Sequence, residues 1–239
     1  MIRFPPPLTF PNEQSLVPFV TLRRGEEAAP ANLHILRQRD GSRLRLFYGD
    51  EDPRDRPVRG ILWARCGFSR DGDGMPAGEP LWKFMHPYRQ MATMLAGRCQ
   101  VCTRPARTPL GYLFLTGPKD RHPAQPLLTG QPPVCVRHVH TTAKLCPHMA
   151  GDPVVCLADR APLHGVIGSV YGRGPDGAVT PVSAPPEPVT FNDPRAPLLL
   201  GSQLVRRLSS FRVLDLDGLR QLLATGHDGA TRIPAPHGT

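Results

Sequence analysis

The amino-acid sequence predicts an α+β fold built from short strands and short helices. Apolar runs with partial alternation are separated by glycine, proline and charged clusters, which is typical of short strands. Along the chain, strand-like runs come first, then a helical segment, two cysteine-containing pairs, more strand-like runs and further helices, an order that favours α+β. The 30 prolines among 239 residues exceed the usual share of about 5% and argue against long helices.

We expect four regions along the chain. Residues 1–14 read as an extended arm with a polyproline segment. Residues 15–80 form a β-rich N-terminal region, and residues 81–226 form an α+β region around the cysteine pairs. Residues 227–239 are expected to be a disordered tail.

The β-rich region contains four expected strands and two loops. The strands lie in SLVPFVTL, NLHILRQR, RLRLFY and GILWARC. The stretches GDEDPRDRPVRG and SRDGDGMPAGEP are expected loops, because charged clusters and Asp-Gly steps signal turns. A helix is then expected over Pro87–Ala96, since proline is tolerated in a first turn and Gly97 can end the helix in the left-handed conformation.

The second half alternates strands and helices. GYLFLT is an expected strand, a proline- and glycine-rich loop runs to residue 133, and residues 136–145 are expected to be helical. Four further strands lie in PVVCLA, GVIGSVYG, GAVTPV and PVTF. A helix over 197–208 is predicted from its apolar spacing and its early proline. FRVLDL is an expected strand, and Asp217 caps a last helix that Gly226 ends.

The cysteines of the second region have the spacing of a metal site. Cys99 and Cys102 form a Cys-x2-Cys pair, and Cys135 and His138 form a Cys-x2-His pair. A two-residue gap lets one tight turn aim both side chains at one ion, so the sequence predicts a tetrahedral zinc site. A turn with one pair, then a hairpin, then a second pair in the first turn of a helix is a treble-clef-like arrangement.

The fourth ligand is open to alternatives. Cys146 and His148 follow the second helix, and either could replace His138. Cys66 and Cys156 lie in apolar strand contexts and are expected to be core thiols. If four protein ligands close the tetrahedron, no position remains for water and the zinc is structural.

The sequence predicts a cytoplasmic location. The N-terminus lacks the uninterrupted apolar segment of a signal peptide, and no apolar run approaches the ~20 residues that cross a bilayer. Thiols stay reduced in the cytoplasm, where clustered cysteines indicate metal binding more often than disulfides.

The basic charge has two readings. The formal net charge is +9, and only three of the 29 basic residues are lysine. An arginine-rich, GC-biased composition with a solvated basic surface is the simpler reading. Phosphate recognition is the other reading, and its candidate contacts are Arg98, Arg104, Arg107, Arg137 and Lys144.

Function is less specified than the metal site. We expect a non-catalytic binding or adaptor protein whose partner is another protein, with a nucleic-acid-binding regulator as the alternative. A third hypothesis is an HNH-type nuclease using Asp120, His122 and either His138 or His140. No phosphate-binding loop, dinucleotide fingerprint or nucleophile-elbow motif is present.

Part of the chain resembles a known family. RCQVCTRPA, PPVCVRHVHTTAKLCPHM, GVIGSVYG and GSQLVRRL are similar to the pattern of a family of uncharacterised proteins from GC-rich actinobacteria, over roughly residues 85–215. The resemblance supports the metal site and implies no activity. In the family the second pair often ends in cysteine, so His138 is a departure from its pattern.

Overall fold

The computed structural model describes most of the chain and shows a mixed, strand-rich α and β fold. The described residues are 16–28, 31–37, 43–117, 123, 125–145 and 153–225. The arm expected over 1–14 and the tail expected over 227–239 lie outside them. No helix in these described ranges is long and apolar enough to cross a membrane.

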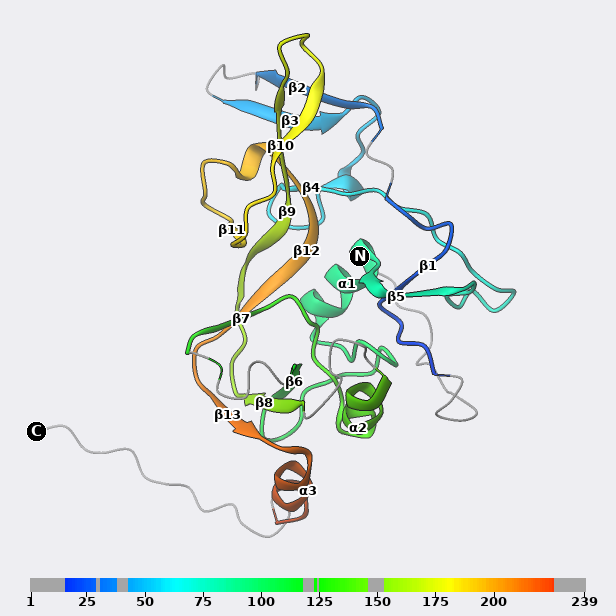
Figure 1. Cartoon of the computed structure of the whole chain (residues 1–239), viewed down its shortest axis with the longest axis vertical. Helices are drawn as coiled ribbons and strands as arrows, with labels where there is room; N and C mark the ends of the chain where they lie inside the picture. The colour runs from blue at the N-terminus through cyan, green and yellow to red at the C-terminus, as the bar shows by residue number, and fades with distance from the viewer. Residues whose placement is uncertain are drawn as a thin grey trace, which may run out of the picture.

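Two long antiparallel strands form the spine of the largest sheet (Figure 1). They are β9 (Leu163–Arg173) and β12 (Leu199–Leu208). The sheet has the order β10-β9-β12-β4, with β11 paired to β9 and β7 paired to β12. These shorter strands are β4 (Leu62–Trp63), β7 (Leu127–Thr129), β10 (Val179–Ser183) and β11 (Val189–Thr190).

Three smaller sheets surround this spine. Strands β13 (Phe211–Leu214), β8 (Val154–Ala158) and β6 (Tyr112–Thr116) pair antiparallel in that order. The hairpin of β2 (Leu33–Arg37) and β3 (Leu44–Tyr48) lies at the opposite end of the molecule from β13 (Figure 1). Strand β1 (Thr21–Arg23) pairs with β5 (Pro80–Met85).

The described residues contain three α-helices, which are α1 (Pro87–Ala96), α2 (Val136–Leu145) and α3 (Leu216–Thr225). The bounds predicted for α1 and α2 are confirmed. His86 caps α1, because its side chain accepts the backbone N–H of Arg89, and Gly97 ends the helix at φ 59°. Short 3-10 turns cover η1 (Pro53–Asp55) and η4 (Ala196–Leu198).

The helix predicted over 197–208 is wrong, because this segment is the short turn η4 followed by β12. The strand lies in the middle of the largest sheet and pairs with β9, β4 and β7. Strands covered on both faces lack a clear period of two, so their apolar spacing can imitate a helix. Gly201 lies in the interior of the predicted helix, where glycine is unfavourable by about 1 kcal/mol.

Three smaller differences also follow from local geometry. The last helix begins one residue before Asp217, and Asp215 takes the capping role by accepting the Gly218 N–H at 2.6 Å. Strands β5 and β7 form inside segments that were expected to be loops or were given no element. Both are stabilised by pairing with remote strands, β1 and β12 respectively.

Helix α1 is joined to the large sheet by its polar side chains. The Gln90 amide donates to the carbonyl oxygens of Gly130 at 2.7 Å and Leu204 at 2.8 Å, and it accepts the Leu204 N–H at 2.9 Å. Since β12 is a central strand, these bonds fix α1 against the sheet. Helix α1 ends at Gly97, two residues before Cys99, so its fixed position also places the start of the cysteine turn.

Candidate metal centre

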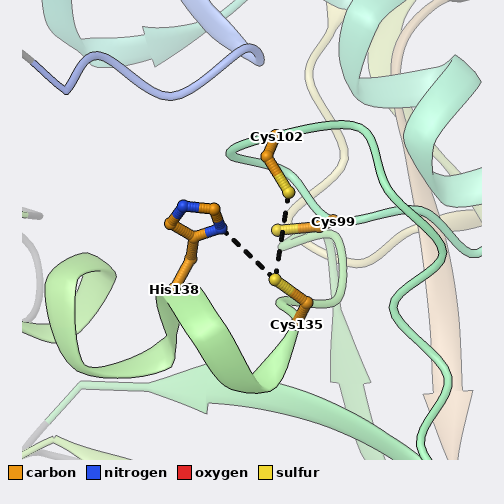
Figure 2. A group of neighbouring side chains, drawn as sticks. All are labelled: Cys99, Cys102, Cys135 and His138. Carbon is orange, nitrogen blue, oxygen red and sulfur yellow. Dashed lines mark hydrogen bonds between the residues drawn. The ribbon is translucent and has the colours of Figure 1, made fainter. Parts of the chain in front are cut away.

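Three cysteines and one histidine converge on a single point next to helix α2 (Figure 2). One ligand atom from each of Cys99, Cys102, Cys135 and His138 lies within 4.8 Å of the others. The two cysteines of the first pair are fully buried, and His138 is 7% exposed. Sequence spacing alone therefore identified a set of side chains that the fold brings together from segments more than 30 residues apart.

The first pair lies on a tight turn directly after α1. The Cys99 N–H donates to the Arg104 carbonyl at 2.8 Å, and the Thr103 N–H donates to the Cys99 carbonyl at 3.0 Å. Thr103 has a φ of 62°, a left-handed conformation that a non-glycine residue adopts only where the surroundings hold it. The Val101 N–H points at the Cys99 sulfur at 3.4 Å. This turn aims both sulfur atoms to one side.

The second pair opens helix α2, which begins directly after Cys135. The His138 N–H donates to the Cys135 carbonyl at 3.0 Å, which places both side chains on the same side of the first turn. The Val134 N–H bonds to the carbonyl of Leu113 in β6 at 2.9 Å, and the Gln100 N–H bonds to Pro133 at 3.0 Å. The two pairs are thus held together by backbone hydrogen bonds as well as by their side chains.

The sulfur and nitrogen atoms are close enough to perturb one another's protonation. The Cys135 sulfur lies 3.9 Å from the Cys102 sulfur and 3.3 Å from the His138 Nδ1. Hydrogen bonds from Cys102 and then Cys99 hold the pKa of the Cys135 thiol well below its usual range. The same kind of bonds hold the pKa of Cys99 well above its usual range. Hydrogen bonding to Cys102 and Cys135 raises the pKa of His138 to about 9.

The closeness of these ligand atoms has one chemical consequence. Three thiols this close and this buried cannot all ionise without a nearby positive charge, because like charges and burial both oppose it. A divalent cation supplies that charge and lets all the thiolates form. Three thiolates and an imidazole are a donor set that suits a soft or borderline ion in a tetrahedral site. The residues therefore fit a metal ion.

The alternate ligands and two of the residues in the nuclease hypothesis are not described by the structure. Cys146 and His148 lie outside the described residues, as do Asp120 and His122. His140 is described; it lies on α2, is partly buried and is not one of the four clustered residues.

The other two thiols differ from each other. Cys156 in β8 is fully buried among apolar side chains, as expected for a core thiol. Cys66 is only partly buried, lies beyond the end of β4 and contacts the His86 ring at 3.3–3.4 Å. His86 is not among the residues predicted from the sequence to be functional, although its position just before Pro87 at a helix start is a local signal.

The candidate nucleic-acid contacts fall into two groups. Arg104, Arg137 and Lys144 are exposed, the first on the cysteine turn and the others on α2. Arg98 donates to the Thr103 carbonyl at 2.7 Å and so braces the turn. Arg107 is exposed and pairs with Asp159 at 3.5 Å.

A comparison of the chain with protein-family models, curated proteins and solved structures finds no match. The function must therefore be argued from the side chains themselves.

Proposed function

We propose that the chain is a zinc-stabilised, non-catalytic binding protein that acts as an adaptor for another protein in the cytoplasm. The observation that carries the structural part is the cluster of four metal-binding side chains within 4.8 Å. Zinc in structural sites takes four protein ligands in a tetrahedron, whereas catalytic zinc keeps one position for water. Four protein ligands from two segments leave no such position, so the ion would stabilise the fold.

The ligand arrangement also supports a treble-clef-like frame. The Cys99–Cys102 turn precedes β6, and the second pair occupies the first turn of α2. The 32 residues between Cys102 and Cys135 contain β6 and β7, which pair with β8 and β12 and not with each other, so this segment departs from the short hairpin of that frame. A cluster of three free thiols also suits the reducing conditions of the cytoplasm.

Metal analysis with one matched pair of variants tests the zinc site. We expect purified protein to contain one zinc per chain, and Cys99→Ser to lose it. The control is Cys66→Ser, because this thiol lies outside the cluster. Replacement of the zinc by cobalt should give the intense visible absorption of a tetrahedral thiolate complex. An equal zinc content in both variants, or none in the native protein, would refute the proposed site.

The adaptor role is supported by an exposed aromatic pair on β5. Trp82 and Phe84 are 40% and 61% exposed, and they alternate along one strand, so they project from the same side of it. Large exposed aromatic side chains are common at protein interfaces, where their buried area contributes most of the binding energy.

Native co-purification with two surface variants tests this role. A partner protein recovered with the native chain should be lost from the double variant Trp82→Ser/Phe84→Ser. The control is Val182→Ser on β10, which removes an equally exposed apolar side chain (61%). If both variants recover the same partner, β5 is not part of the interface and the proposal is contradicted.

A second candidate is a nucleic-acid-binding regulator, favoured by the exposed cations Arg104, Arg137 and Lys144 near the metal centre. Binding through phosphate contacts releases counterions, so affinity should fall steeply with salt. A duplex-binding titration at several salt concentrations separates the two functions. Triple replacement of these cations by glutamine should flatten the salt dependence if this candidate is right.

A further inference from the structure

A cavity of about 1030 Å³ lies between helix α1, the turn η1 and the loop that follows β4. It is separate from the metal centre, since none of the four clustered residues lines it. Sites that hold small molecules have volumes of about 300–1,000 Å³, with apolar walls and a few placed polar groups. The cavity is therefore large enough for a ligand of that class.

Aromatic and apolar side chains form one wall of this cavity. Phe68 is 49% exposed, although it is a large apolar side chain. Its ring centroid lies 6.0 Å from that of Tyr88 and 4.6 Å from that of His86. Met91 and Ala92 of α1 also line the cavity. A flat apolar ligand would cover the exposed face of Phe68 and remove it from water.

The carboxylates that line the cavity already have cationic partners. Arg65 forms a two-point contact with Asp55 at 2.9 and 2.7 Å and also reaches Asp50 at 2.8 Å. Arg54 binds Asp52, with its shortest contact at 2.7 Å. A cationic ligand would have to displace one of these arginines. Because Asp50 and Asp55 share the single charge of Arg65, this group of side chains keeps an excess of negative charge.

Arg70 differs from the other arginines that line the cavity. It contacts no carboxylate among the described residues; its guanidinium donates to the Gly74 carbonyl at 3.3 Å and lies 5.3 Å from the centre of the Phe68 ring. The Phe68 ring in turn lies next to that of Tyr88. An anionic group on a ligand would therefore be attracted to Arg70 and repelled by the aspartates that line the same cavity, which favours one orientation.

Cys66 lines the cavity and contacts the fully buried His86, and the state of this pair favours binding over covalent chemistry. Burial raises the pKa of the Cys66 thiol to about 12, and burial followed by the charge of Arg89 lowers the pKa of His86 to about 3. Both ring nitrogens of His86 are also occupied, Nε2 by the Gly67 carbonyl and Nδ1 by the Arg89 N–H. The pair therefore stays as a neutral thiol and a neutral imidazole, and it lacks the thiolate that a nucleophile requires.

We propose that this cavity binds a small planar aromatic molecule that carries an anionic group, with the ring against Phe68 and the anion on Arg70. The anionic group belongs to a phosphate, as in a nucleotide, or to an aromatic carboxylate. Both kinds of molecule offer an aromatic ring for Phe68 and a negative charge for Arg70. This site shares no residue with the metal cluster or with Trp82 and Phe84 of β5.

A pair of fluorescent probes tests the proposal on the zinc-loaded full chain. One probe is 1-anilinonaphthalene-8-sulfonate, and the other is N-phenyl-1-naphthylamine, which has the same aromatic body without the sulfonate. We expect saturable one-site binding of the anionic probe, about tenfold tighter than the neutral one, since one charge-assisted contact corresponds to about that ratio. Arg70→Gln should abolish the difference between the probes, and Phe68→Ala should weaken both.

The control is Arg212→Gln, which removes an exposed arginine from β13 and should leave both affinities unchanged. Competition with adenosine monophosphate and with 1-naphthoate then identifies the anion. Displacement of the anionic probe by either compound supports the site, and the stronger competitor shows whether a phosphate or an aromatic carboxylate is preferred. The proposal is overturned if Arg70→Gln binds the anionic probe as tightly as the native chain. It is also overturned if neither competitor displaces the probe.

Discussion

Removal of the buried Glu26 carboxylate should lower the free energy of unfolding much more than removal of a surface charge does. Glu26 is fully buried and pairs with Arg89, whose side chain is 4% exposed. Its oxygens also accept the backbone N–H groups of Arg23 and Ser69, each at 2.8 Å. In Glu26→Ala, the guanidinium and two backbone donors lose their acceptor while the surrounding structure still excludes water.

The expected loss is about 3–5 kcal/mol, the usual effect of removing one partner from a buried ion pair. Arg89 keeps only its bonds to the carbonyl oxygens of Phe19 at 3.1 Å and Thr21 at 2.9 Å. For a chain of this size, such a loss lowers the thermal midpoint by about 6–20 °C. The assay is urea unfolding with zinc in excess, compared with thermal unfolding in the same buffer.

The matched control is Glu79→Ala, which removes the partner of Arg24. That pair is more than 60% exposed on both sides, so water replaces the lost contact and no measurable change is expected. If Glu26→Ala and Glu79→Ala unfold at the same urea concentration, the argument from burial is wrong.

Three further predictions concern the core, pH and the metal. Gly168→Ala should lower the free energy of unfolding by about 1–3 kcal/mol, because an added Cβ would collide with the Leu200 carbonyl oxygen. The control is Gly72→Ala, where nothing lies within 4 Å of the added Cβ. Equal unfolding midpoints for the two variants would contradict this reasoning. The pKa of His86 is lowered to about 3, so the unfolded ring binds a proton below about pH 6.5 while the folded ring stays neutral. Between pH 7 and pH 5 the native chain should therefore lose about 2 kcal/mol more than His86→Asn, and parallel pH profiles would refute this. A strong chelator should lower the thermal midpoint and added zinc should restore it; an unchanged midpoint after proven metal removal would show that the ion does not support the fold.

The features that sequence predicted well are those specified by neighbouring residues. The bounds of α1 follow from Pro87 at the first turn and Gly97 at the end, both of which act locally. The metal cluster follows from two short spacings, each of which fixes a turn. The Cys-x2-Cys and Cys-x2-His pairs needed only to come together in the fold, and the chain between them is long enough for that.

The features that sequence predicted poorly depend on remote partners. Strand β12 was assigned as a helix because its environment is set by β9 and β4, which lie far along the chain. The cavity has no local signature either, since its lining residues come from the turn η1, the loop after β4 and helix α1, which are separated along the chain. Its charge pairs are visible only when the fold places Asp55 against Arg65. Long-range pairing therefore accounts for most of what the sequence analysis missed.

The metal centre and the cavity are joined by one strip of backbone. The Phe19 and Val20 N–H groups bond to the carbonyls of Val101 and Gln100 on the cysteine turn, each at 3.2 Å. The Phe19 carbonyl accepts from Arg89, and both Phe19 and Arg89 line the cavity. Because these bonds connect the two directly, we expect a shift of the cysteine turn to be passed to Phe19 and Arg89 in the cavity wall. A metal ion bound by the four ligands would then also hold this wall of the cavity in place, so removal of the metal should weaken binding of the anionic probe.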